Sequence, residues 1–179
     1  MIHYIETPIT QDTLKKLKAG DQVFISGTIY TARDQAHVRL INEENIMFPI
    51  MNSIIYYVGP TPKKEGFPIG SSGPTSSYRM DKLAAILMQR GVKVMIGKGD
   101  RSVDFRKAMI EAQSVYLIAT GGAGALLSSK IKASKIVMYE DLGPEAIYEL
   151  KVEKFPCFVA YDIYNQSIFS HLEQTQKNN

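Results

Sequence analysis

A regular alternation of short apolar segments with amphipathic ones is the feature that most constrains how this chain can fold. The segments 54–58, 92–96 and 114–119 are short and largely apolar, as strands buried on both faces are. Between them lie 79–91, which carries an apolar stripe at helical spacing, and a second helical pattern at 103–112. Because strands alternating with helices form βαβ units, an α/β domain with a mainly parallel sheet and flanking helices is predicted.

Weaker patterns extend this prediction toward both ends of the chain. Predicted helices cover 12–18 and 33–45, and predicted strands cover 22–31, 135–139, 149–152 and 157–163. Segment 63–72 is predicted to be a long loop, and loops of this length are usually functional or mobile. Helix 79–91 is expected to stop at Gly91. Thr10 and either Ser102 or Asp100 are expected to cap helices.

Size and charge bound the class of protein. A chain of 179 residues can bury one core, so 1–170 is predicted to be a single domain and polar 171–179 a disordered tail. The formal charge of +3 comes without a run of Lys and Arg, so no nucleic-acid partner is expected. No apolar stretch approaches the roughly 20 residues of a membrane span, and the N-terminus lacks a secretory pattern. A soluble cytoplasmic protein without a membrane partner is expected.

Cysteine usage limits the metal chemistry. Cys157 is the single cysteine of the sequence, so an internal disulfide is excluded. An iron–sulfur site built from this chain's thiolates alone is excluded as well, because such sites normally need three or four. No residue of this chain is therefore predicted to bind a metal.

The segment 73–81 (GPTSSYRMD) combines a turn, hydroxyls, an arginine and a carboxylate. If a helix begins near Thr75 or Ser76, its free N–H groups and positive dipole end offer a site for an anion. Thr75 and Arg79 are four residues apart and can face one pocket. The alternative is an ordinary helix start with Arg79 in solvent.

Two further segments carry cations. In a helix, Asp34 and His37 share a face, and so do Arg33 and His37; an arginine can bind a carboxylate with two hydrogen bonds, and Asp34 would set the charge of His37. The alternative is a local ion pair at a helix start. Lys98, between Gly97 and Gly99, directly follows a predicted strand, where α/β sheets bind ligands. The alternative there is a tight turn with exposed charges.

The glycine segment 121–124 is a weak nucleotide signal. It has the first spacing of a dinucleotide fingerprint, but Leu127 stands where the third glycine would be. A tightly packed turn, or one that contacts a carboxylate, is the favoured interpretation. Glu140 and Asp141, just ahead of a Gly-Pro turn, are interpreted as structural.

Together, five blocks resemble the β subunit, or C-terminal domain, of the iron–sulfur class I fumarate hydratase and L-tartrate dehydratase family. The blocks are 27–37 (GTIYTARDQAH), 57–62 (YVGPTP), 73–81 (GPTSSYRMD), 97–102 (GKGDRS) and 139–147 (YEDLGPEAI). They come in the family's order and at its spacing, and the resemblance runs from about residue 20 to 169. Each block is modest alone, and the set is specific.

The resemblance implies a swivelling β/β/α domain and a partner. In this family an α subunit or α domain carries the cysteines that hold a [4Fe–4S] cluster, so the cluster is expected on the partner rather than on this chain. A homo-oligomer or a heterotetramer is expected. Activity is expected only with the cluster-bearing α partner.

The resemblance also assigns roles to residues. Thr75 stands at the family's catalytic threonine, acting as alkoxide or proton relay. The residues that match the family's binders of substrate carboxylates are Arg33, Arg79 and Lys98. The residues expected to orient them are Asp34, His37 and Asp81.

The reaction implied is that of a hydro-lyase on a C4 dicarboxylate, foremost the interconversion of malate and fumarate. A weakly acidic C–H proton must be removed and a dianionic intermediate stabilised, and the leaving hydroxyl needs a Lewis acid. Tartrate and methyl-substituted dicarboxylates stay open as substrates, because the same cations fit each. A standalone module that binds a small anion or a nucleotide through 121–124 is the alternative from another class.

Overall fold

The computed structural model describes residues 1–119 and 124–169. In chain order, the elements are β1 (Ile2–Glu6), α1 (Gln11–Lys16), β2 (Gln22–Thr31), α2 (Asp34–Leu40), β3 (Ile54–Tyr56), the 3₁₀ helix η1 (Tyr78–Met80), α3 (Asp81–Gln89), β4 (Val94–Gly97), α4 (Val103–Glu111), β5 (Val115–Ile118), α5 (Gly124–Ser129), β6 (Ile131–Met138), the 3₁₀ segment η2 (Glu140–Glu145) and β7 (Ile147–Tyr161). The predicted α/β class is confirmed. The predicted tail 171–179 and most of the glycine segment 121–124 lie outside the described residues.

The strands form one mixed sheet that closes on itself. Within the described residues, seven strands follow the order β1-β2-β3-β4-β5-β7-β6, and β2 pairs with β7 as well. Strands β1 to β5 pair in parallel with their neighbours, whereas β7 is antiparallel to β2, β5 and β6. The ring β2-β3-β4-β5-β7 is therefore a closed barrel, and the prediction of a mainly parallel sheet is wrong. The connection from β6 to β7 is too short for a parallel crossover, so β7 must run antiparallel.

One long strand replaces two predicted ones at the end of the chain. The 15 residues of β7 cover the predicted strand 149–152 and the predicted strand 157–163 as far as Tyr161, and the intervening break is a bulge. Lys154 has a positive φ of 49°, and the register with β2 shifts between Ile25 and Gly27. Pro156, which cannot donate a main-chain hydrogen bond, sits just after this bulge opposite Phe24. A charged, proline-containing stretch therefore bends the strand without ending it.

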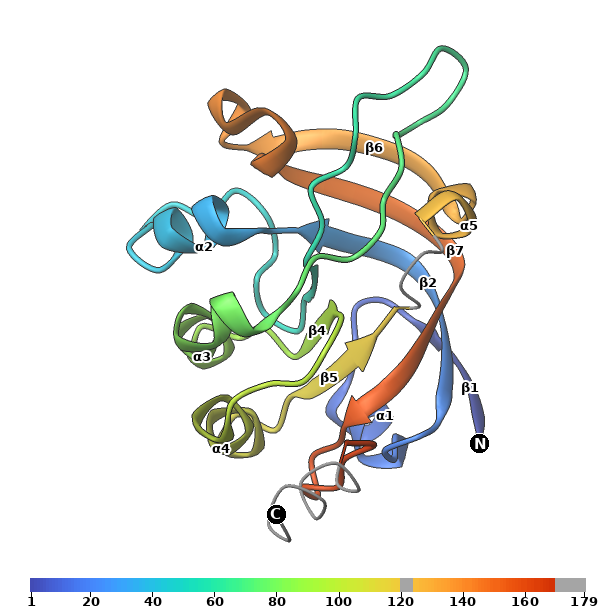
Figure 1. Cartoon of the computed structure of the whole chain (residues 1–179). Coiled ribbons are helices and arrows are strands. Elements are labelled where there is room, and N and C mark those ends of the chain that lie inside the picture. Colours follow the sequence, from blue (N-terminus) through green and yellow to red (C-terminus); the bar gives the residue numbers. More distant parts are fainter. Residues whose placement is uncertain (120–123, 170–179) are drawn as a thin grey trace, which may run out of the picture.

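Two apolar cores lie on opposite faces of the sheet. Alternate residues of the parallel strands enter different cores, because successive strand side chains point to opposite faces. In β3, Ile54 and Tyr56 join the core that α1 and α5 complete, whereas Ile55 joins the core beneath α2, α3 and α4. Figure 1 shows these three helices stacked along one side of the sheet. Burial on both faces explains the nearly continuous apolar composition of the parallel strands.

Most local predictions agree with the structure. Thr10 caps α1 by accepting a hydrogen bond from Thr13 N at 3.2 Å, and Ser102 caps α4 in the same way through Phe105 N. Gly91, with φ of 113°, ends the helical segment that contains α3. Strand β1 and helix α5 were not predicted. The loop that contains 63–72 has no helix or strand and projects from the body of the molecule (Figure 1).

Across the described ranges, 1–119 and 124–169, every helix is too short or too polar to cross a lipid bilayer.

Candidate active site

The carboxyl ends of three neighbouring parallel strands bring the predicted cations to one edge of the sheet. Arg33 and Asp34 follow β2, Tyr57 follows β3 and Lys98 follows β4, and these strands are adjacent. Ligands of α/β sheets bind at such edges. The structure therefore brings together segments that lie far apart in the sequence, whereas the role of each residue stays a prediction.

Thr75 is held at this edge by main-chain contacts. Its N–H donates to the carbonyl of Tyr57 at 2.8 Å, and the following Ser76 pairs with Lys98 in a parallel bridge. The first helical turn is η1, Tyr78–Met80. The expectation of a helix N-terminus near Thr75 or Ser76 is therefore wrong, because the N–H of Thr75 is already used and the helix begins later.

Arg79 connects Thr75 with Asp34. Its Nη2 donates to Thr75 Oγ1 at 3.2 Å, and its Nε lies 3.3 Å from Asp34 Oδ2. The two side chains thus meet as predicted, although Thr75 precedes the helix and the two do not share a helical face. The side chains of Arg79 and Asp34 are 41% and 34% exposed, and ion pairs of this kind are worth less than about 1 kcal/mol. A substrate carboxylate can therefore replace Asp34 at small cost.

Arg33 is only loosely engaged. Its Nε lies 3.8 Å from Glu145 Oε1, which is beyond hydrogen-bond distance, and this buried Nε has no hydrogen-bond partner among the described residues. A Cβ on Gly59 would lie 2.9 Å from Arg33 Cδ, so the absence of a side chain at Gly59 makes room for the arginine. Arg33 therefore keeps donors for a carboxylate.

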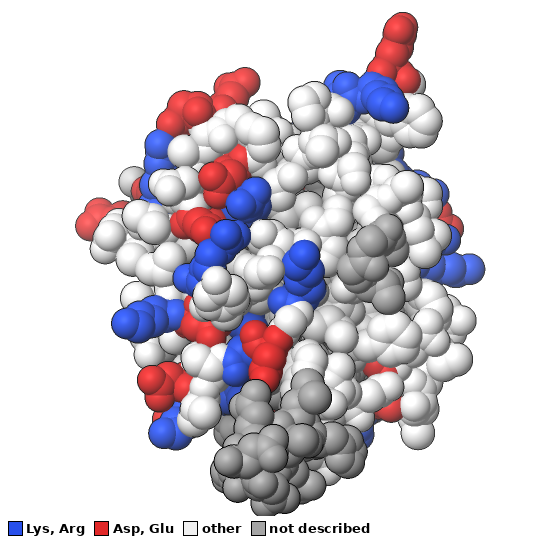
Figure 2. All heavy atoms as spheres, in the orientation of Figure 1, with Lys and Arg blue, Asp and Glu red and all other residues white. Residues whose placement is uncertain are grey.

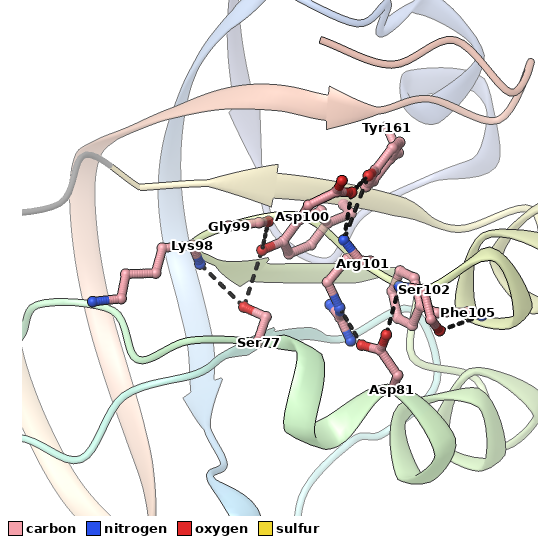
Figure 3. A network of polar contacts seen from close by, with 10 residues as sticks. Ser77, Asp81, Lys98, Gly99, Asp100, Arg101, Ser102, Phe105 and Tyr161 are labelled. Carbon is pink, nitrogen blue, oxygen red and sulfur yellow. Dashed lines mark hydrogen bonds and ion pairs between the residues drawn. The ribbon is translucent and has the colours of Figure 1, made fainter. Parts of the chain in front are cut away.

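Lys98 projects outward from the end of β4. Its side chain is exposed, and its ammonium forms no ion pair with any residue in the described ranges. In Figure 3 this side chain extends away from the buried contacts of Ser77, Asp81 and Arg101. Among the described residues, Lys98 thus carries an unpaired positive charge, next to Ser76, the residue that follows Thr75.

Asp81 orients a different cation from those predicted. Its Oδ1 lies 2.5 Å from Arg101 Nε, and its Oδ2 accepts a hydrogen bond from Ser102 N at 2.7 Å. The guanidinium of Arg101 is fully buried and lies over the ring of Phe105, 3.5 Å from the centroid. This ion pair joins the start of α3 to the turn after Lys98. Asp81 therefore helps to fix the position of that turn at the sheet edge.

His37 is buried and neutral. Its Nδ1 lies 2.9 Å from the carbonyl of Arg33; a carbonyl only accepts, so Nδ1 carries the proton. Burial is the largest influence on its pKa and lowers it to about 4, although Asp34 acts in the opposite direction. The expectation that Asp34 sets the charge of His37 is therefore wrong. His37 holds the main chain of Arg33 as a neutral donor.

An open cavity of about 800 Å³ lies beside the cluster. It is lined by the starts of α3 and α4, including Arg79, Asp81 and Ser102. Thr75 and Lys98 do not line it. The two regions meet at Arg79. On the face shown in Figure 2, Lys and Arg side chains alternate with Asp and Glu and form no continuous basic stripe.

This chain's residues do not fit an iron–sulfur cluster. Cys157 is buried in β7, and burial raises the pKa of its thiol, which opposes the thiolate that a cluster needs. In the part of the chain that the structure describes, no group of three or more His, Cys, Asp and Glu side chains could hold a metal ion. The described residues therefore offer no ligand set for such a cluster.

Three residues of the site were missed from the sequence: Ser77, Arg101 and Tyr116. Tyr116 lies in the apolar segment 114–119 and is fully buried, but its hydroxyl reaches Ser77 at 3.0 Å. A buried tyrosine normally needs a partner for its hydroxyl. That requirement predicts a polar partner for a buried tyrosine, but it does not say which residue supplies it.

Fold and site together define a class: a closed, mixed α/β barrel domain whose parallel strands present arginine, lysine and threonine at one edge. The family model described as "Fumarase C-terminus" matches residues 2–172. The chain belongs to this family.

Curated relatives fall into two kinds. A protein of Methanocaldococcus jannaschii named "Putative L(+)-tartrate dehydratase subunit beta" is 36% identical over 97% of this chain and 94% of its own length. "Fumarate hydratase class I, aerobic" of Escherichia coli is 36% identical over 91% of this chain and 31% of its own length. "Fumarate hydratase 1, mitochondrial" of Leishmania major is 33% identical over 92% of this chain and 31% of its own length. The chain thus spans nearly all of the first relative and about a third of the other two.

Proposed function

We propose that this chain is the β subunit of an iron–sulfur-dependent hydro-lyase that interconverts malate and fumarate, active only with a cluster-bearing α partner. The observation that carries the proposal is the contact of Thr75 with Arg79, at the sheet edge that also holds Arg33 and Lys98, in a chain of this family. A C4 dicarboxylate has two anionic ends, and the edge offers cations on both sides of one hydroxyl.

The relatives support a separate subunit. The tartrate dehydratase relative, a subunit by its name, has nearly the length of this chain. The fumarate hydratase relatives are about three times as long, so about two thirds of their length lies outside the matched part. We propose that a second polypeptide supplies the counterpart here, together with the [4Fe–4S] cluster. When bound, such a cluster supplies a Lewis acid for the leaving hydroxyl.

Substrate binding would use Arg33, Arg79 and Lys98. Arg33 has a donor without a partner among the described residues, and the ion pair of Arg79 is with a half-exposed carboxylate, Asp34, that a substrate can replace. Arginine suits this task because its planar fork matches a carboxylate. Lys98 would add a point charge near the dianionic intermediate.

Proton transfer would use Thr75. Arg79 donates to Thr75 Oγ1, so it stabilises negative charge on that oxygen and leaves the hydroxyl proton free to point at substrate. Solvent weakens this effect in the isolated chain, because Arg79 is exposed. We propose that the partner excludes water and so completes the activation of Thr75.

The substrate is proposed to be malate and fumarate, with tartrate as the second candidate. Repeated matches to fumarate hydratases support malate and fumarate, whereas the relative of similar length to this chain is named for tartrate. The same cations fit both substrates, because both carry two carboxylates on a four-carbon chain.

The test is reconstitution. The chain is purified anaerobically with and without its α partner, and hydration of fumarate and dehydration of L-tartrate are measured in both samples. We expect the assembled pair to turn over fumarate and the isolated chain to be inactive. If the pair turned over tartrate but not fumarate, the proposed substrate would change and the reaction class would remain.

Inactivity of the pair with both substrates, together with nucleotide binding by the chain alone, would support the binding-module alternative. One contact argues against that alternative: a Cβ on Gly124 would lie 2.5 Å from Ser71 Oγ. The described end of the glycine segment therefore packs against the chain's own loop.

A further inference from the structure

Ser77 fastens the segment that carries Thr75 to the turn that carries Lys98. The Ser77 Oγ accepts a hydrogen bond from the N–H of Lys98 at 3.1 Å, and the Ser77 N–H donates to the carbonyl of Lys98 at 3.3 Å. Ser77 is 1% exposed, so water does not compete for these bonds. Figure 3 shows Ser77 between Lys98 and the deeper residues of the network.

Gly97 allows this close approach. A Cβ at Gly97 would lie 1.9 Å from Ser77 Oγ and 2.9 Å from the ring of Tyr57. Real Cβ atoms do not come so near to another atom, so the end of β4 must be glycine for Ser77 to reach it. The main chain next to Lys98 therefore packs in direct contact with Ser77.

Tyr116 completes the contact from β5. Its hydroxyl lies 3.0 Å from Ser77 Oγ and 3.1 Å from the carbonyl of Gly99. When the phenol donates its one proton to Gly99, the Ser77 hydroxyl is free to donate to the phenol oxygen. The resulting chain of hydrogen bonds runs from the N–H of Lys98 through Ser77 and Tyr116 to the carbonyl of Gly99. It therefore fixes the main chain at Lys98 and at the residue that follows it. Burial raises the pKa of Tyr116, so the phenol stays a neutral donor.

We propose that Ser77 and Tyr116 are positioning residues that fix Lys98 relative to Thr75. The catalytic meaning of this inference rests on the proposed function. Neither residue is exposed to a substrate, since both are buried, and both act through Lys98 and the segment after Thr75. The Lys98 side chain is exposed and unpaired within the described ranges, so the position of its main chain decides where the ammonium can lie.

A positioning role and a structural role predict different kinetics. A structural role lowers the free energy of unfolding and leaves turnover per folded enzyme unchanged. A positioning role lowers kcat with little change in KM, because misplacing a group by about 1 Å can cost about 100-fold in rate.

The test compares Ser77→Ala and Tyr116→Phe with Ser114→Ala in the enzyme assembled with its α partner. Ser114 is a matched control: its buried hydroxyl donates to the carbonyl of Val92 at 3.1 Å, just before β5 and at the opposite end of that strand from Gly99. We expect kcat to fall about 10- to 100-fold in Ser77→Ala, less in Tyr116→Phe, and to stay near wild type in Ser114→Ala. The double variant should be no worse than Ser77→Ala, because both residues belong to one hydrogen-bond chain.

Amide hydrogen exchange of Lys98 in the full chain gives a readout independent of activity. Ser77→Ala should speed this exchange roughly fivefold to tenfold, and Ser114→Ala should not. Unchanged exchange, or wild-type kcat in both Ser77→Ala and Tyr116→Phe, would overturn the inference. If Ser77→Ala does not fold, Tyr116→Phe decides. An inactive wild-type assembly would refute the proposed function and the catalytic role, while exchange still decides whether Ser77 holds Lys98.

Discussion

Two ion pairs near Thr75 differ in their exposure to solvent: an outer one at the sheet edge and an inner one buried under that edge. At the edge, Arg79 and Asp34 are 41% and 34% exposed and 3.3 Å apart. Beneath it, Arg101 and Asp81 are 0% and 8% exposed and 2.5 Å apart. The first pair is weak and exchangeable, whereas the second cannot lose one partner without leaving a buried charge. A ligand can therefore compete for the outer charges, while the inner ones keep the edge in shape.

The comparison also separates chemistry from stability. Outer residues should change turnover or substrate binding when they are replaced, with little effect on folding. Replacing a member of the inner ion pair, Arg101 or Asp81, should change the free energy of unfolding. The four predictions that follow test this division.

The largest effect is expected at Thr75. Thr75→Ala removes the hydroxyl that Arg79 contacts, and losing a group that transfers a proton costs 10²- to 10⁴-fold in rate. We expect kcat of the assembled enzyme to fall by about that factor, with an unchanged melting temperature. Thr75→Ser keeps the hydroxyl and should retain most of the activity. Full activity of Thr75→Ala would refute its assigned role.

The next effect is expected in the inner layer. Asp81→Ala leaves the buried guanidinium of Arg101 without its carboxylate, which costs about 3–5 kcal/mol. Asp34→Ala removes the carboxylate of the exposed pair and should cost less than about 1 kcal/mol. Urea unfolding of both variants measures the difference. Equal costs would mean that the two layers do not differ as described.

The pH dependence of stability sharpens the description of the inner layer. Burial lowers the pKa of His37 to about 4 from 6.5, so between pH 6.5 and 4 the unfolded chain binds a proton that the folded chain does not. The free energy of unfolding should therefore fall as the pH falls through this window, by up to about 3 kcal/mol. His37→Asn keeps an N–H for the carbonyl of Arg33 and cannot titrate. If His37→Asn kept the wild-type dependence of the free energy of unfolding on pH, another group would be responsible for it.

A smaller effect is expected at Arg33. Arg33→Ala should raise KM roughly 10- to 100-fold, the value of a hydrogen-bonded charge, with a smaller change in kcat. Arg39, on the helix that directly follows Arg33, is bound to Asp141 at 2.6 Å on the surface, so Arg39→Ala is the matched control and should leave KM unchanged. An equal KM in both variants would remove Arg33 from the binding site.

Much of the fold followed from local pattern, because the parallel strands are buried on both faces and flanked by amphipathic helices. The direction of β7 did not, since strand direction depends on the path of the connection. The sequence did contain a clue: the predicted strands 135–139 and 149–152 are too close for a parallel crossover. The bulge near Lys154 was taken for a break because charge and proline mark both.

The outer cations were predictable because the blocks around Arg33, Thr75 and Lys98 each follow or precede a recognisable element. Their shared edge follows from parallel strand order. The link between Ser77 and Tyr116 was not predictable, because it joins residues 39 positions apart through side chains that look like ordinary turn and core residues. The same holds for the burial of His37, whose helical position suggested a charged partner of Asp34.

The most direct test of the central claim is a structure of the chain assembled with its α partner and a bound dicarboxylate inhibitor. One carboxylate is expected within hydrogen-bond distance of Arg33 or Arg79, with the carbon chain against Thr75 Oγ1 and Lys98. An inhibitor bound instead in the cavity between the starts of α3 and α4, away from Thr75, would contradict the account.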